Sequence, residues 1–284
     1  MDREDIQSMV LQAQRRERFA RYYLLTFGSG EPRRALTRLV ADVSSADEAA
    51  GSGARCQCAL AASGLRALGL TDAELAQFPR EFRQGMAHPE RALSNGDRAA
   101  DSPEHWEFGG PNTPPIDALW LTFSDDAAYL EQLSAQYERL FARFGLSFLV
   151  HSVALNSPEP RSAPELGPRR RFKRVPYGEF VLGERDAVGE RIRGPLVAIK
   201  HSARPMPAWV RTNNALDFGK NGSYLVVRKV LQSWFMRLNV DLRRQFEFER
   251  AEAQVSGPRS GRLHGGGYFF LPSVRALNYL AEGG

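Results

Sequence analysis

The distribution of apolar and polar residues divides the first half of the chain into short strands separated by helices. Runs dense in β-branched and aromatic residues predict strands, because such side chains pack well on a half-buried pleated surface. These runs cover residues 19–27, 56–61, 116–124 and 146–155. Helical spacing of apolar residues covers 32–43 and 125–144, with a short helical turn at 63–68. The order β-α-β-β-α-β predicts an α+β ferredoxin-like unit, in which two helices cover one face of a four-stranded antiparallel sheet.

An apolar stripe predicts each of the two longer helices. The first has Pro32 in its first turn and Ser29 or Gly30 at its start. Its inward residues are Leu36, Leu39, Val40 and Val43. The inward residues of the second are Leu130, Leu133, Tyr137, Leu140 and Phe141. Between them, residues 87–115 are polar and rich in Gly, Pro and Asn, which predicts a long surface loop around Pro103-Glu104-His105-Trp106.

The second half supplies too few elements for another complete unit. Strand material surrounds Tyr224, Phe235 and Tyr268, and helices are predicted near residues 242–253 and 273–281. A complete copy of the first plan needs four strands and two packed helices. By this count at least one strand is missing, and we expect an incomplete second ferredoxin-like unit.

Composition sets the predicted domain boundaries. Pro, Arg and Ser dominate residues 157–176, and an irregular stretch follows with one apolar patch at 196–199. The predicted domains are an N-terminal unit at residues 1–156, a linker at 157–216 and a reduced second unit at 217–284.

The join inside this second unit is ambiguous. Residues 223–230 and 235–240 both have the composition of strands, but no Gly, Pro, Asn or Asp between them sets a reversal. A continuous helix is the alternative, although no apolar face emerges at helical spacing. The sequence does not decide how the chain turns between Val230 and Phe235.

The length and composition of the chain limit the class of protein to which it can belong. A chain of 284 residues with 43% hydrophobic residues can bury a full core in one or two domains. It has no apolar run of about eighteen residues, and residues 1–7 are polar and acidic, unlike a signal sequence. We therefore expect a globular cytoplasmic protein with no membrane partner. The two cysteines, Cys56 and Cys58, share one face of a strand and are badly placed for a mutual disulfide, so buried reduced thiols are expected.

The charge pattern indicates no nucleic-acid binding. The formal net charge of +5 is modest, because acidic residues are plentiful too. One basic run at residues 169–174 could contact phosphate or an acidic partner, and a solvated loop is the plainer interpretation. Only Phe172 interrupts this run, so no platform for stacking bases is indicated. We expect no specific nucleic-acid partner.

Several blocks of the sequence resemble the dye-decolourising (DyP-type) haem peroxidases. The blocks are residues 5–7, 75–86, 177–183, 221–232, 239–248 and 265–277. The most specific are Asn-Gly-Ser-Tyr-Leu-Val at 221–226 and Phe-Pro-Arg-Glu-Phe-Arg-Gln-Gly-Met at 78–86. In the family, a long segment separates the block at 221–232 from the block at 239–248. That segment is missing here, so the resemblance implies a truncated member.

The missing segment is the one to which the resemblance assigns most of the chemistry. A haem peroxidase needs an axial iron ligand, usually histidine, with an acid or base and a positive group on the open face. In the family, the axial His lies in a Gly-x-His-x-x-Arg-like segment and a distal Arg follows it, both within the missing part. The distal Asp lies in a Gly-x-x-Asp-Gly motif just before the block that matches 177–183, and residues 157–176 contain no Asp. All three groups are therefore expected to be absent.

Three residues are candidates to replace them. Asp186, in Gly-Glu-Arg-Asp, is similar to the acid motif but follows the Gly-Glu-Phe block instead of preceding it. His201 and Arg204 are similar to the His-x-x-Arg of the axial segment but precede residue 221. Chain order argues against all three, so Asp186 and Arg204 are only weak catalytic candidates and His201 a weak haem-binding one.

The remaining motifs indicate no metal or phosphate site. We expect surface or half-buried positions for His88, His105 and His151, while His264 marks the entry to the last strand. No histidines and carboxylates stand at metal-ligand spacing. Gly265 to Gly267 precede a strand, so they cannot aim a helix N-terminus at an anion.

Three functions are consistent with these patterns. The first is a haem-less pseudoenzyme with a binding or assembly role and no cofactor. The second is a peroxidase that keeps haem b, bound through His201, and reduces hydrogen peroxide with dye-like organic electron donors and help from Asp186 or Arg204. The third is a partner-binding subunit, because a sheet short of a strand exposes an edge that pairs with a second chain. The third function predicts a homo-oligomer or a complex with another protein.

Overall fold

The computed structural model describes most of the chain and divides it into two compact units. The described residues are 2–11, 17–48, 53–154, 180–185, 189–191, 194–198, 211–212, 215–232 and 261–283. Unit 1 comprises Met1–Arg83, Ile116–Leu225 and Phe269–Gly284, and unit 2 comprises Gln84–Pro115 and Val226–Tyr268. The boundaries predicted at residues 156 and 217 rest on composition rather than on contacts, and they stay a prediction.

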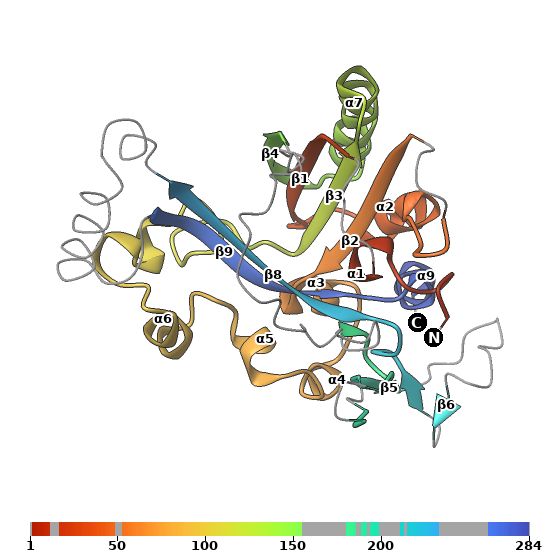
Figure 1. The fold of residues 1–284 in the computed structure, drawn as a ribbon. Coiled ribbons are helices and arrows are strands. Elements are labelled where there is room, and N and C mark those ends of the chain that lie inside the picture. The colour runs from red at the N-terminus through yellow and green to blue at the C-terminus, as the bar shows by residue number, and fades with distance from the viewer. Residues whose placement is uncertain are drawn as a thin grey trace, which may run out of the picture. The chain divides into compact units, whose positions relative to one another are not determined.

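Antiparallel strands form the centre of unit 1 (Figure 1). They are β1 (Phe19–Thr26), β2 (Ala54–Leu60), β3 (Ala118–Ser124) and β4 (Ser147–Ala154). The sheet has the order β4-β1-β3-β2-β9-β8, in which β8 is Ser223–Gln232 and β9 is Gly261–Leu271. Tyr23 of β1 faces Trp120 of β3 on one side and Val150 of β4 on the other. The prediction of a mixed α and β fold built on an antiparallel sheet is confirmed.

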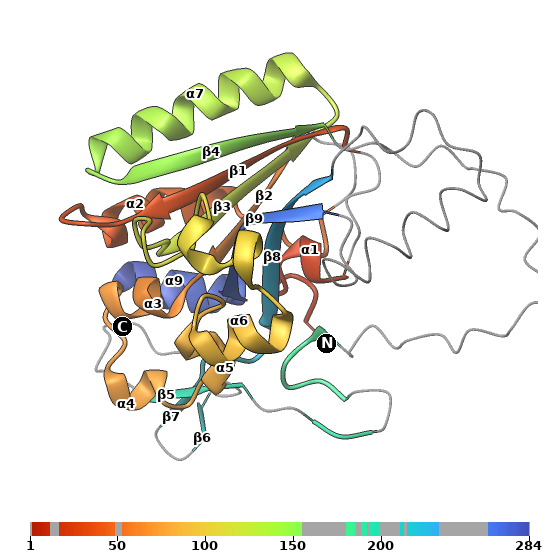
Figure 2. The ribbon, with the colours of Figure 1, turned by 90° about the vertical axis from the view of Figure 1, so that its left-hand side faces the viewer.

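Helices cover one face of these strands. The longest, α7 (Ala127–Arg143), packs on β1, β3 and β4 and runs beside them in Figure 2. Asp126 caps it by accepting hydrogen bonds from the backbone N–H groups of Ala128 and Tyr129. Aromatic rings fill the space beneath, where Trp120 and Tyr137 meet edge to face with centroids 5.1 Å apart. The helical stripe of the sequence therefore faces this core.

The remaining helices of unit 1 are shorter. They are α1 (Ser8–Leu11), α2 (Pro32–Leu39), the 3-10 turn Val40–Asp42, α3 (Ala62–Ala67), α4 (Asp72–Leu75), α5 (Arg80–Gln84) and α9 (Val274–Glu282). The N-cap of α2 is Glu31, so the predicted start at Ser29 or Gly30 is wrong. Gly30 lies so close to the end of α7 that an added Cβ would meet the carbonyl oxygen of Phe144 at 2.6 Å. This close approach keeps Gly30 outside the helix.

Residues 87–115 of unit 2 form short helical elements around a small apolar cluster. The segment contains α6 (Pro89–Asn95) and two 3-10 turns, Ala99–Asp101 and Pro103–His105. Most of this segment is exposed or half-buried, as predicted for a surface excursion, but Trp106 and Phe108 are buried beside Met86. Glycines of β9 make room for them, since a Cβ on Gly265 would lie 2.8 Å from the Phe108 ring and one on Gly266 2.4 Å from the sulfur of Met86. These glycines therefore lie inside the strand, not before it.

The second half of the chain is described in part. The predicted strand at 223–230 is β8, and the strand around Tyr268 and the last helix are β9 and α9. The predicted strand at 235–240 and helix at 242–253 lie outside the described residues. Three short strands, β5 (Leu196–Ala198), β6 (Arg211–Thr212) and β7 (Ala215–Asp217), form a second sheet where an irregular connection was predicted. Among the helices that the structure describes, none is both long and apolar enough to span a membrane.

Candidate functional site

The residues predicted from the sequence as replacement site residues cannot be placed. Asp186, His201 and Arg204 all lie outside the described residues, and so does the basic run at 169–174. Their roles stay predictions.

The described histidines occupy surface or half-buried positions, as expected. His88 precedes α6 with its Nε2 atom 3.4 Å from Nε2 of Gln84, His105 is exposed, and His151 is half-buried in β4. His264 lies within β9, which begins at Gly261, so it does not mark the entry to that strand. Within the described ranges, no group of three or more His, Cys, Asp or Glu side chains could hold a metal ion.

Both cysteines are buried and unoxidised, as predicted. Burial raises the pKa of the Cys56 thiol to about 12, against a smaller lowering by the Tyr137 hydroxyl 3.2 Å away. Burial also raises the pKa of Cys58 to about 12. Tyr137 donates a hydrogen bond to Asp42 at 3.1 Å, and burial raises its own pKa. Burial therefore disfavours the thiolate form of both cysteines, which is the form that acts as a nucleophile or a metal ligand.

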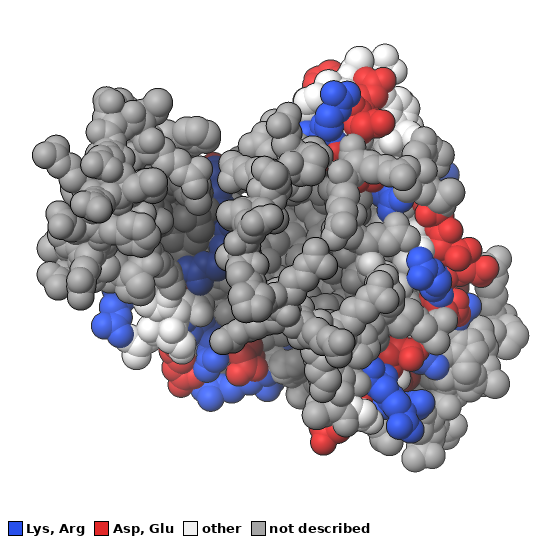
Figure 3. Space-filling model, in the orientation of Figure 1, with Lys and Arg blue, Asp and Glu red and all other residues white. Residues whose placement is uncertain are grey.

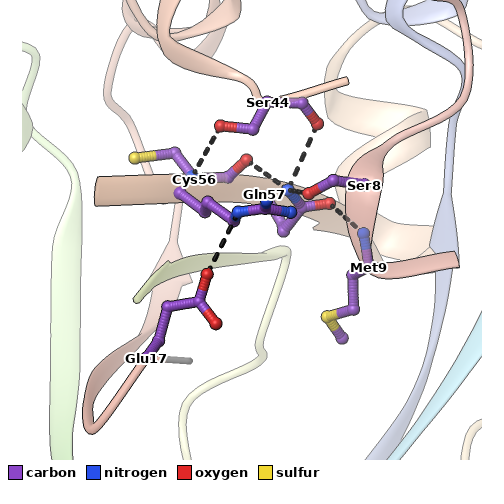
Figure 4. A network of polar contacts seen from close by, with 7 residues as sticks. Ser8, Met9, Glu17, Ser44, Cys56 and Gln57 are labelled. Carbon is purple, nitrogen blue, oxygen red and sulfur yellow. Dashed lines mark hydrogen bonds and ion pairs between the residues drawn. The ribbon is translucent and has the colours of Figure 1, made fainter. Parts of the chain in front are cut away.

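A buried glutamine on β2 lies at the centre of a polar network of unit 1 (Figure 4). Gln57 donates hydrogen bonds to the Ser8 hydroxyl at 2.8 Å and to the Cys56 carbonyl at 2.7 Å. Its side-chain oxygen accepts one from the backbone of Met9 at 3.2 Å. Beside it, Arg55 pairs with Glu17 at 3.0 Å. The side-chain amide of Gln57 both donates and accepts hydrogen bonds within this network, which joins α1 to β2. Few of its donor and acceptor positions are therefore left for a ligand.

Residues Asp5, Ile6 and Gln7 also join separate elements of the fold through buried hydrogen bonds. Asp5 is almost fully buried and accepts hydrogen bonds from the side chain of Asn221 at 2.8 Å and from the backbone N–H of Arg275 at 2.9 Å. Gln7 bonds both the carbonyl and the N–H of Cys58, each at 2.8 Å, in the manner of a neighbouring strand. This block joins the N-terminal segment to β2, to α9 and to the turn before β8.

Ion pairs hold the residues after α6 to β8 within unit 2. Arg228 donates to Asp97 at 2.5 Å, and the Asp97 side chain is completely inaccessible to solvent. Lys229 contacts Glu107 at 2.5 Å, with about two fifths of each side chain exposed. Sequence reasoning missed both pairs, because 131 residues separate Arg228 from Asp97 and no local signal joins them.

Elsewhere among the described residues, the charged side chains do not cluster into a site. On the face drawn in Figure 3, the basic and acidic side chains of the described residues are intermixed, and no broad patch of one sign stands out among them. This mixture matches the modest net charge of +5. It offers no extended basic surface of the kind that tracks a phosphate backbone.

The outer edge of β4 is the described feature best suited to binding. β4 is the first strand of the sheet order, with β1 as its neighbour. Eight consecutive residue pairs join β4 to β1 without a bulge, from Phe19 with Ala154 to Thr26 with Ser147. Phe148 and Leu149 remain 37% and 38% exposed. The signal missed in the sequence is that residues 147–154 contain no Lys, Arg, Asp, Glu or Pro to protect an edge.

The fold resembles part of several solved structures. No protein-family model and no curated protein matches the sequence. A dye-decolorizing peroxidase (DyP) in complex with 2,6-dimethoxyphenol matches with a TM-score of 0.53 at 17% identity, over 82% of this chain and 50% of that one. A decolorizing peroxidase from Auricularia auricula-judae matches with a TM-score of 0.53 at 20% identity, over 82% of this chain and 49% of that one.

A third structure agrees with these two. It belongs to a study of asymmetric sulfoxidation by engineering the heme pocket of a dye-decolorizing peroxidase, and it matches with a TM-score of 0.51 at 19% identity. It covers 82% of this chain and 49% of its own length, so this chain spans about half the length of the structures it resembles. The chain therefore shares the mixed helix and antiparallel-sheet fold of part of the dye-decolourising peroxidases.

Proposed function

We propose that this protein is a truncated member of the DyP-type peroxidase family that binds no haem and serves a binding or assembly role. The likeness of fold supports the family, and the sequence blocks at 78–86 and 221–226 support it independently. The proposed pseudoenzyme lacks the family's axial His, distal Asp and distal Arg.

One observation carries this proposal. The resemblance places the axial histidine segment after the block at 221–232, and residues 233–260, which lead from β8 to β9, contain no histidine at all. Haem iron also accepts a cysteine thiolate, but Cys56 and Cys58 are buried with pKa values raised to about 12. Neither cysteine therefore suits haem iron as a thiolate ligand, which supports the proposal.

The ferredoxin-like plan is part of the same proposal. We assign one complete unit to residues 1–156, a linker to 157–216 and a reduced second unit to 217–284. The strand order β4-β1-β3-β2 and the succession β1, α2, β2, β3, α7, β4 support the complete unit. Only β8, β9 and α9 of the described residues support the reduced one.

The haem content of the purified protein tests the proposal. The full chain is expressed with a haem precursor in the medium, and the haem band is compared with the protein absorbance. The expected result is no haem above trace level, before and after incubation with hemin. One haem per chain in a band that survives gel filtration would overturn the proposal.

The second candidate function keeps the enzyme, because His201 and Arg204 have the His-x-x-Arg spacing of the axial segment. In this case His201 holds haem b, and Asp186 or Arg204 assists as hydrogen peroxide takes two electrons from dye-like donors and two protons to give two waters. His201→Ala then removes both the haem and the turnover. Haem that stays bound to the His201→Ala variant eliminates this candidate.

A further inference from the structure

We infer that the outer edge of β4 (Ser147–Ala154) pairs with β4 of a second copy of this chain, extending the sheet across a two-fold axis. The inference deepens the assembly role proposed above and names its surface and its partner. It rests on the strand's place in the sheet, its chemistry and its symmetry.

The place of β4 at the end of the sheet gives it one neighbour among the described strands. β4 stands first in the order β4-β1-β3-β2-β9-β8, so among the strands that the structure describes only β1 adjoins it. The eight unbroken pairs with β1 keep the strand regular along its whole length. A regular edge presents alternate N–H and C=O groups outward, which is a template for another strand.

The chemistry of β4 favours pairing. Natural edge strands are protected from other chains by Lys, other charges, Pro, bulges or shortness. The sequence Ser-Phe-Leu-Val-His-Ser-Val-Ala has none of these sequence devices, and its pairing with β1 shows no bulge. Phe148 and Leu149 point to opposite faces because they are consecutive in a strand, and both stay more than a third exposed. An added strand would therefore cover apolar surface on both faces.

Symmetry identifies the occupant as a second copy. A strand that pairs antiparallel with itself is self-complementary, because a two-fold axis perpendicular to the sheet brings each donor to the equivalent acceptor. Such an axis preserves the faces of the sheet, so a register centred on His151 sets Leu149 of one copy opposite Val153 of the other. This pairing buries Leu149 without introducing a charge, and closed two-fold dimers are the commonest protein oligomers.

The mass of the full chain in solution tests the inference. Light scattering on a gel-filtration peak is expected to give twice the 31.7 kDa of one chain. Leu149→Lys places a charge on the edge and is expected to give a monomer. The matched control is Tyr129→Lys, which changes an equally exposed large residue on α7 and is expected to stay dimeric.

A second variant keeps the test valid if Leu149→Lys fails to fold. Ser152→Lys alters a side chain that is already polar and exposed, so circular dichroism should match the unaltered protein while the mass falls to one chain. A monomer for the unaltered protein at every concentration, or a dimer that survives both β4 variants, overturns the inference. A dimer that carries haem contradicts the proposed function alone, and a haem-free monomer contradicts the β4 pairing alone.

Discussion

The two end strands of the six-stranded sheet, β8 and β4, differ in the charged residues that they carry. β8 carries Arg228 and Lys229, and each is engaged in an ion pair with residues of unit 2. β4 carries no Lys, Arg, Asp or Glu and exposes Phe148 and Leu149. Charge on an edge strand discourages pairing, whereas a regular apolar edge invites it. β8 also exposes Val226, so the presence or absence of charged residues is the difference that supports the proposed assembly role of β4.

Alkaline pH is expected to have the largest effect, and the two thiols through which it acts lie on an interior strand of the sheet. Cys56 and Cys58 lie on the interior strand β2, and burial raises their pKa from the ordinary 9.0 to about 12. Below about 9 both thiols are protonated whether the chain is folded or unfolded. As the pH rises from 9 to 12, the unfolded chain loses these protons first, so the free energy of unfolding falls.

The Cys58→Ala variant isolates this effect. Denaturant unfolding measured at several pH values should show a shallower decline between pH 9 and 12 for the variant than for the unaltered protein. The comparison uses the slope rather than the absolute stability, because loss of the buried sulfur lowers stability at every pH. Identical slopes in the two proteins would contradict buried, protonated thiols on β2.

Removing the buried ion pair of β8 is the next largest change. Arg228→Met takes the cation away from Asp97, whose side chain is inaccessible to solvent. Loss of one partner of a buried pair costs about 3 kcal/mol in the free energy of unfolding, because the remaining charge stays buried. Chemical denaturation measures the loss. A variant as stable as the unaltered protein would show that Arg228 does not hold β8 in place.

Lys229→Met is the matched control one residue along the same strand. Lys229 and Glu107 are both partly exposed, and exposed pairs contribute about 0.5 kcal/mol. The expected loss is therefore small and shrinks further in high salt. A loss equal to that of Arg228→Met would erase the distinction between the buried and the exposed pair.

Charging the β4 edge is expected to have the smallest effect on the stability of the single chain. Ser152 is exposed, and surface substitutions change the free energy of unfolding by about 0.5 kcal/mol or less. Ser152→Lys should therefore unfold at nearly the same denaturant concentration as a dissociated unaltered sample. A large loss of stability would mean that Ser152 supports the fold of one chain rather than contacts between two.

Local patterns predicted the first four strands and the two longer helices, because the period of apolar residues is set by each element alone. The start of α2 was misplaced because Gly30 is fixed by the end of α7, far along the chain. The core of residues 87–115 was missed because Phe108 and Met86 are buried against glycines of β9. Both errors concern contacts between distant segments, which a local window does not contain.

The candidate site was predicted less well than the fold. The resemblance pointed to Asp186, His201 and Arg204, which lie outside the described residues and stay predictions. The expectation that a sheet edge pairs with a second chain rests on the missing strand, and the charge-free stretch 147–154 does not by itself show that β4 is an edge strand. That choice needs the strand order, since a strand of the same composition in the middle of the sheet would simply be core.

The most direct test is a single gel-filtration run of the full chain that records light scattering, protein absorbance and the haem band together. We predict one peak of twice 31.7 kDa without haem absorbance. A peak of one chain mass that carries one haem per chain would contradict both the haem-less assignment and the pairing through β4.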